Sequence, residues 1–169
     1  LSFAGNLVLV ALATACWIAP AHAIEPATPE EVLRLLVRAN AEKDIATLSR
    51  YMAHDADVVG YTVGGRKYVG WPAFEQAMRE EFKAVTRLEI PITELNVWTK
   101  GDVAWFTMEL DYIRYVGKST ELKRTVLPLR ETGVLERRNG QWVMLSWHES
   151  FRSAQMTGPV AQQSAASAG

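Results

Sequence analysis

Cysteine is nearly absent from this 169-residue sequence, which contains only Cys16. Because Cys16 lies in the apolar N-terminal stretch described below, the rest of the chain can form no disulfide, cysteine nucleophile or thiolate metal site. Histidine is scarce as well, with three residues. His54 stands beside Asp55 and Asp57, but this short run is more typical of a turn than of a metal site. The sequence therefore predicts no metal and no cofactor.

A surplus of charge is also missing, since 18 Lys and Arg residues stand against 19 Asp and Glu residues. Without a basic excess nothing indicates a nucleic-acid partner, and without an acidic tract nothing indicates a solvating tail. Long hydrophobic runs are lacking too. The apolar run Leu7–Ala15 is much shorter than the roughly 20 residues that a membrane-spanning helix needs. We expect no stable insertion into a membrane.

Residues 1–23 form a separate segment, which contains no charged residue and ends in Ala-x-Ala at positions 21–23. An apolar run before such a site is typical of a secretory signal. We predict a signal peptide over 1–23 with cleavage after Ala23, and a periplasmic or secreted mature protein. Acylation of Cys16, which would give a lipid anchor, is the alternative. The predicted domain covers 24–152, and residues 153–169, which lack any periodicity, are predicted to be a disordered tail.

Three helices are predicted in the first half of the domain. The first begins with a capping box, in which Thr28 caps the helix, Pro29 takes its first position and Glu31 reaches back. The second helix is expected over Ile45–Met52. The third begins at Pro72 and places four apolar side chains on one stripe, namely Phe74, Met78, Phe82 and Val85.

Strands dominate the rest of the domain. Two short strands are predicted on either side of the Gly64–Gly65 turn, and four longer ones at about 88–98, 102–115, 122–137 and 141–151. Asn139–Gly140 is a strong hairpin signal between the last two strands. Helices followed by an antiparallel meander indicate an α+β fold. We expect one curved, mostly antiparallel sheet wrapped on about three N-terminal helices, with a cone that can hold a ligand.

Four segments carry a family pattern, namely ANAEKDIATLSRYMAHDADVVG, YVGWPAFEQAMREEF, GDVAWFTMELDY and RETGVLERRNGQWVMLSWHES. They resemble the SnoaL-like group of the nuclear transport factor two-like (ketosteroid isomerase-like) superfamily over roughly residues 28–150. The resemblance implies a cone-shaped α+β barrel, a homodimer, and a pocket between the concave face of the sheet and the helices. It does not fix the function, because this superfamily contains enzymes and non-catalytic assembly modules.

The catalytic residues of ketosteroid isomerase are not carried over by the resemblance. Its general-base aspartate falls near Gly60 and its tyrosine near Leu36. Its protonated aspartate falls at Thr132 or Gly133. The pocket arginine of the kinase hub domains, which share the fold, is also replaced by Gly133. The resemblance therefore supports a fold and a pocket without supporting a known reaction.

The face of each strand decides which side chains reach the pocket. Successive side chains of a strand point to opposite faces, so His148 and Glu149 cannot form a dyad unless a bulge intervenes. The resemblance places two sets of three residues on the concave face: Trp105, Thr107 and Glu109, and Leu145, Trp147 and Glu149. On the opposite face it places His148 and an apolar patch of Phe106, Met108, Leu110, Trp142 and Met144. This patch favours a homodimer.

Glu109 and Glu149 are the candidate catalytic residues, because a carboxyl held against tryptophan has a raised pKa and can act as an acid or base. Alternatively, they are solvated or pair with Arg130 or Arg152. The candidate ligand-binding residues are Trp105, Thr107, Leu145, Trp147, Trp71 and Arg130, and Trp71 could instead serve only to start its helix. His148 becomes the best proton shuttle if the two faces are reversed.

The sequence thus predicts an exported protein that binds a small apolar or amphipathic molecule in an apolar, tryptophan- and carboxylate-lined pocket. Two alternatives stay open. One is a proton-transfer enzyme (isomerase, dehydratase or cyclase) that uses a pocket glutamate. The other is a non-catalytic dimerisation module.

Overall fold

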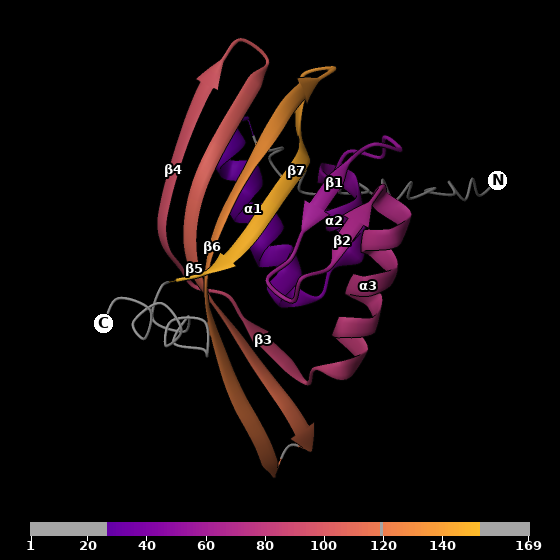
Figure 1. Ribbon diagram of the computed structural model, residues 1–169, viewed down its shortest axis with the longest axis vertical. Coiled ribbons are helices and arrows are strands. Elements are labelled where there is room, and N and C mark those ends of the chain that lie inside the picture. Colours follow the sequence, from indigo (N-terminus) through magenta and orange to yellow (C-terminus); the bar gives the residue numbers. More distant parts are fainter. Residues whose placement is uncertain (1–26, 119, 153–169) are drawn as a thin grey trace, which may run out of the picture.

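The computed structural model describes residues 27–118 and 120–152 (Figure 1). The predicted signal peptide over 1–23, the cleavage site after Ala23, the alternative lipid anchor at Cys16 and the predicted tail over 153–169 lie outside the described residues. Among the helices of the described part, none has the length and apolar character needed to cross a bilayer.

Helix α1 (Pro29–Glu42) begins with the predicted capping box. The Thr28 hydroxyl accepts a hydrogen bond from the Glu31 amide at 3.2 Å, and the Glu31 carboxylate accepts one from the Thr28 amide at 3.0 Å. The helix ends at Lys43, whose ammonium donates to three backbone carbonyls, those of Phe82, Val85 and Thr86. These bonds fix the end of α1 to the end of helix α3 (Trp71–Ala84).

Helix α2 (Ile45–Tyr51) and a short hairpin connect α1 to α3. The hairpin consists of β1 (Val59–Tyr61) and β2 (Lys67–Val69), which pair antiparallel around the predicted glycine turn. Gly65 has φ 78° there, a left-handed conformation that glycine adopts without strain. The three predicted helices and the hairpin are therefore present, with boundaries within one or two residues of those expected.

The remaining strands are β3 (Arg87–Glu89), β4 (Ile92–Lys100), β5 (Val103–Lys118), β6 (Glu121–Arg138) and β7 (Gln141–Phe151). The single strand expected at 88–98 is therefore two strands, β3 and β4, with Pro91 between them, because proline cannot donate a ladder hydrogen bond. Both pair with β5, at different stretches of it. The sheet order is β2-β1-β7-β6-β5-β3, and β1 runs parallel to β7.

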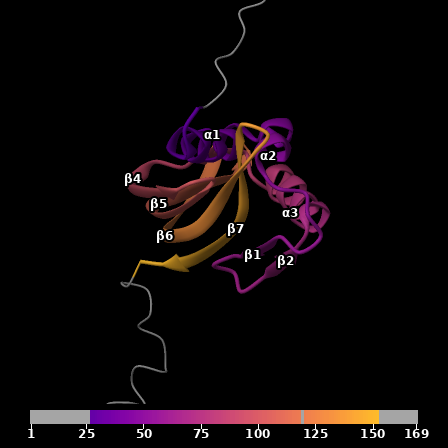
Figure 2. The same cartoon turned by 90° about the horizontal axis from the view of Figure 1, so that it is seen from above.

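The sheet curves around one side of the molecule, and the three helices close the other side (Figure 2). This is the predicted α+β fold, which is confirmed. The core lies between the helices and the concave face of the sheet. It contains Leu33 and Leu36 from α1 together with Ala104, Phe106, Met108 and Leu110 from β5 and Trp142 and Met144 from β7.

This core corrects the predicted convex patch. Phe106, Met108, Leu110, Trp142 and Met144 face the helices and are buried, whereas they were expected on the outer face. The reason is that only the concave face is covered by helices, so the large apolar side chains must occupy it. Self-association stays a prediction, without the support that this patch was expected to give.

The assignment of the two faces of β5 can be tested by a pair of neighbouring substitutions. Phe106→Ala is expected to lower the free energy of unfolding by about 3–5 kcal/mol, because it removes a buried ring and leaves a cavity. Thr107→Ala, on the exposed face, is expected to change it by less than about 1 kcal/mol. Urea unfolding followed by circular dichroism measures both values. Similar losses for the two variants would contradict the assignment.

Candidate functional site

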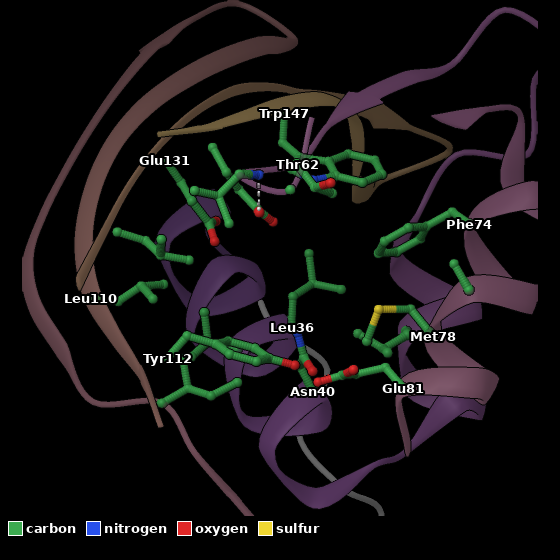
Figure 3. A pocket seen from close by; sticks show the side chains of 18 of the residues that line it. Leu36, Asn40, Thr62, Phe74, Met78, Glu81, Leu110, Tyr112, Glu131 and Trp147 are labelled. Atoms are coloured by element: carbon green, nitrogen blue, oxygen red, sulfur yellow. Dashed lines mark hydrogen bonds between the residues drawn. The ribbon is translucent and has the colours of Figure 1, made fainter. Parts of the chain in front are cut away.

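A cavity of about 610 Å³ lies inside the cone (Figure 3). Its volume is within the range of small-molecule sites, roughly 300–1,000 Å³. The helices and the concave face of the sheet provide mostly apolar walls. The apolar lining residues are Leu33, Leu36, Val37, Leu48, Met52, Val63, Phe74, Ala77, Met78, Ala84, Ile90, Met108, Leu110, Leu127, Leu129, Met144 and Trp147.

The faces of β5 correct the first predicted set of site residues. Met108, Leu110 and Tyr112 line the cavity, so the residues that alternate with them point outward. Trp105, which is 44% exposed, and Thr107 are on this outer face. Glu109 is there too, and its carboxylate lies 3.4 Å from Arg130 and 3.6 Å from Arg152. The prediction that Trp105, Thr107, Glu109 and Arg130 face the ligand is therefore wrong.

A β-bulge in β7 determines which of its side chains face the cavity. Leu135 pairs with Met144, but Val134 pairs with Ser146, so Leu145 is an extra residue without a partner in β6. Simple alternation would put Met144 and Trp147 on opposite faces. With the bulge, both line the cavity, and so does Glu149. Leu145 itself does not line the cavity, which corrects its predicted role in binding.

His148 and Trp71 do not border the cavity either. His148 is exposed on the outer face, where its ring meets Tyr61 edge-on at 5.9 Å. Trp71 is buried at the beginning of α3, stacked on His54 at 5.3 Å and in contact with Phe74. Trp71 therefore packs against Phe74, which does line the cavity. Its role is structural, rather than the direct ligand contact that was the other expectation from the sequence.

The β1–β2 hairpin covers one side of the cavity, to which it contributes Thr62, Val63, Gly64 and Arg66. Its approach to β7 requires a glycine at position 60. A Cβ atom there would come within 2.2 Å of the Trp147 ring. The indole thus occupies the space at Gly60, where the resemblance placed the base of the isomerase. Any side chain at position 60 would therefore have to displace this ring.

Two carboxyl groups face each other on the cavity wall, and the sequence predicted only one of them. Glu149 of β7 is directly opposite Glu131 of β6, so their Cβ atoms are roughly 5 Å apart. Both residues line the cavity. If β6 and β7 paired regularly from the Asn139–Gly140 turn onward, Glu149 would lie opposite Arg130. The bulge shifts its partner to Glu131. The sequence did contain a signal for Glu131, because this residue alternates along its strand with Leu127 and Leu129, which face inward.

The surroundings of this pair favour one shared proton. Burial, followed by the charge of Glu149, raises the pKa of Glu131 to about 8. Burial also raises the pKa of Glu149, but the Val63 amide donates a hydrogen bond to its carboxylate at 3.0 Å and opposes that shift. No ion pair or hydrogen bond from a described residue reaches the Glu131 carboxyl. Glu131 is therefore the more readily protonated carboxyl of the pair.

A second polar region lies near the other end of the cavity. Figure 3 shows the ends of Asn40, Tyr112 and Glu81 converging there, at a distance from Glu131 and Trp147. The Glu81 carboxylate accepts two hydrogen bonds from Arg114, at 2.6 and 2.9 Å. Burial, and then the charge of Glu81, raises the pKa of the Tyr112 hydroxyl, which stays protonated. Between the two polar regions the walls are apolar.

The described residues bring together no group of three or more His, Cys, Asp or Glu side chains suited to a metal ion. The chemistry that the cavity itself offers is hydrogen bonding and proton exchange by carboxyl, amide and phenol groups.

Comparison with known proteins gives a family and a fold. The profile of a SnoaL-like domain matches residues 30–154. No curated protein matches the chain.

Many solved structures are similar at low sequence identity. A candidate dehydratase of the NTF2-like family from Streptomyces avermitilis has a TM-score of 0.65 at 20% identity, over 73% of this chain and 93% of its own. A nuclear transport factor 2-like superfamily protein from Salmonella enterica serovar Typhimurium has a TM-score of 0.67 at 12% identity, over 76% of this chain and 92% of its own. A candidate calcium/calmodulin-dependent protein kinase type II association domain from Thiobacillus denitrificans has a TM-score of 0.60 at 20% identity, over 76% of this chain and 100% of its own. These likenesses establish the fold.

The raised pKa of Glu131 predicts how stability depends on pH. Between the ordinary value of 4.5 and about 8, the folded protein holds a proton that the unfolded chain has released. The contribution of this proton is present below about pH 4.5 and is lost as the pH rises through about 8. Glu131→Gln, which cannot ionise, should flatten this decline, so the variant gains stability relative to the wild type as the pH rises toward 8.

Thermal unfolding at several pH values between 5 and 8.5 measures this effect, with Glu109→Gln as the control. Glu109 is also a strand glutamate, but its carboxylate lies on the outer face beside two arginines. We expect the control to keep the wild-type slope. A slope that is the same in the wild type and in Glu131→Gln would show that the carboxyl pair shares no proton.

Proposed function

Because the chain belongs to the SnoaL-like domain family, we propose that it binds a small, mainly apolar molecule inside the cone. The observation that carries this proposal is the cavity of about 610 Å³, whose mostly apolar wall contains the half-buried Glu131–Glu149 pair. If the export expected from residues 1–23 takes place, the ligand is met outside the cytoplasm.

The walls favour a flat or ring-containing ligand. Trp147 and Phe74 come from β7 and α3, and their ring centroids are 4.5 Å apart with the planes tilted by 59°. Both rings border the cavity. Aromatic side chains contribute large apolar contact surfaces and prefer such tilted arrangements with other rings. A ligand ring beside Trp147 would therefore gain apolar contact without displacing a hydrogen-bonded group.

Binding can be tested by filling the cavity from α3. Ala77 lines the cavity and is half-buried, whereas Ala73, one turn earlier, is exposed and does not line it. Ala77→Trp should weaken binding of the neutral dye N-phenyl-1-naphthylamine at least about 10-fold, which corresponds to ~1.4 kcal/mol. Ala73→Trp should leave it unchanged. Fluorescence titration of the dye measures both affinities.

Equal weakening by both substitutions would place the dye on the surface. Absence of saturable binding to the wild type, with this dye or with the smaller aromatic probes used below, would refute the proposal of a binding cavity.

A second function is favoured by one further observation, the cross-strand pairing of the Glu131 and Glu149 carboxyl groups on the cavity wall. We propose that the pair transfers protons to and from the bound molecule. The Glu149 carboxylate takes a proton from a carbon next to a carbonyl, and the Glu131 carboxylic acid gives its proton to the carbonyl oxygen, so an enol forms. In a dehydration, Glu131 would instead give its proton to a leaving hydroxyl, which departs as water. Proton exchange between the two carboxyls restores the pair.

Proton abstraction predicts hydrogen exchange on a simple apolar ketone. The wild type should accelerate exchange of the α-protons of 2-tetralone in D₂O, followed by proton NMR. Glu149→Gln should reduce the acceleration by roughly 10²–10⁴-fold, the usual effect of a positioned base. Glu109→Gln, on the outer face, should retain it. Wild-type exchange no faster than with Glu149→Gln would remove the enzymatic proposal and leave the binding proposal intact.

A further inference from the structure

The polar region at the far end of the cavity contains an oxygen without a donor. Asn40 Oδ1 is buried and has no hydrogen-bond partner, and it is the one such side-chain atom among the described residues. The Tyr112 hydroxyl points to the same place (Figure 3), and no described residue makes a hydrogen bond with it. Leaving a buried polar atom such as Asn40 Oδ1 unpaired is unfavourable, so its presence in a folded protein needs a reason.

The neighbouring groups do not satisfy these two side chains. Glu81 is a carboxylate and cannot donate a hydrogen bond. The two hydrogen bonds that it accepts come from Arg114. Arg114 is turned toward Glu81 by the same two bonds. The apolar side chains Leu36 and Met78 are also near this region of the cavity, and they offer no polar atom. The unpaired amide and phenol therefore face a site that the chain itself leaves incomplete.

The chemistry of the two groups selects their partner. The Asn40 amide oxygen requires a donor, and a half-turn of the amide would present its NH₂ group instead. The Tyr112 hydroxyl can donate or accept. A ligand hydroxyl matches all of these combinations, since it donates one hydrogen bond and accepts others. A carbonyl or ether oxygen accepts only, so it leaves Asn40 Oδ1 unpaired in the orientation that the structure shows. An ionised carboxylate likewise accepts only.

We propose that Asn40 and Tyr112 form a subsite for a hydroxyl group of the ligand, at the end of the cavity opposite the Glu131–Glu149 pair. This proposal rests on the proposed binding function. It narrows the ligand class to amphipathic alcohols or phenols with an apolar body between their polar ends. The hydroxyl enters the Asn40–Tyr112 subsite, and the apolar body lies along Leu110, Met78 and Phe74.

Three probes of similar size test the subsite by calorimetry: naphthalene, 2-methoxynaphthalene and 2-naphthol. They offer no polar group, an acceptor alone, and a donor with an acceptor. The wild type should bind 2-naphthol roughly 5- to 10-fold more tightly than naphthalene, the effect of one or two net hydrogen bonds. The methoxy compound should show less than half of that preference, because it cannot donate to Asn40.

Asn40→Leu and Tyr112→Phe should each reduce the preference for 2-naphthol to about 2-fold or less, with the affinity for naphthalene retained. Tyr115→Phe is the matched control, because the Tyr115 hydroxyl bonds Glu89 and does not line the cavity. Asn40→Leu should also leave the melting temperature of the free protein unchanged or higher, since it removes an unpaired buried acceptor. If Asn40→Leu fails to fold, Asn40 has a structural role, and Tyr112→Phe then decides the test. The subsite is refuted if Tyr112→Phe keeps the preference for 2-naphthol, and it stands if that preference is lost.

The outcomes separate this proposal from the one on which it rests. Equal affinity for naphthalene and 2-naphthol would overturn the hydroxyl subsite, while the binding function would stand. A preference that survives in Asn40→Leu and Tyr112→Phe but is lost in Glu131→Gln would place the hydroxyl at the carboxyl pair and overturn the subsite as well. No binding of any of the three probes would contradict the proposed binding function itself.

Discussion

The site depends on one extra residue in β7. The bulge at Leu145 brings Met144 and Trp147 to the same side of the strand, where regular alternation would separate them. It also shifts the partner of Glu149 by one position, from Arg130 to Glu131. An ordinary cross-strand ion pair on a solvated surface is thereby replaced by two carboxyls in an apolar cavity. The inward position of Trp147 and the pairing of Glu149 with Glu131 both follow from this single shift in register.

The electrostatics of the cavity follow from that pairing. Two like charges at this separation in an apolar wall are unfavourable, so the pair keeps a proton. Burial raises the pKa of Glu149, but the Val63 amide of the hairpin and the Trp147 side chain oppose that rise, whereas no such bond from the described part of the chain opposes the rise at Glu131. Near the far end, the charge of Glu81 is paired with that of Arg114. The cavity thus has two chemically different ends, which favours one orientation of an asymmetric ligand.

The fold could be predicted because its signals are local, but much of the site could not. The capping box at Thr28 and the turn at Asn139–Gly140 act over a few residues, and both features are present in the structure. The faces of β5 could not be read from the strand alone, since Trp105 and Phe106 are both large and apolar, and only the covering helices decide which is buried. Glu131 was missed because the predicted pocket residues came mainly from β5 and β7, although Glu131 alternates with Leu127 and Leu129 in β6. Its pairing with Glu149 could not be predicted, because nothing in the residue type of Leu145 indicates a bulge.

The contact between Gly60 and Trp147 limits how this site could have changed over time. A side chain at position 60 needs the space that the indole now fills, and the indole needs that space to be empty. A base on the hairpin and a tryptophan on β7 therefore exclude each other. A change from one arrangement to the other requires at least two substitutions, and introducing the side chain at position 60 first meets a clash. A change in either direction therefore first passes through a form that has neither the side chain at position 60 nor the tryptophan.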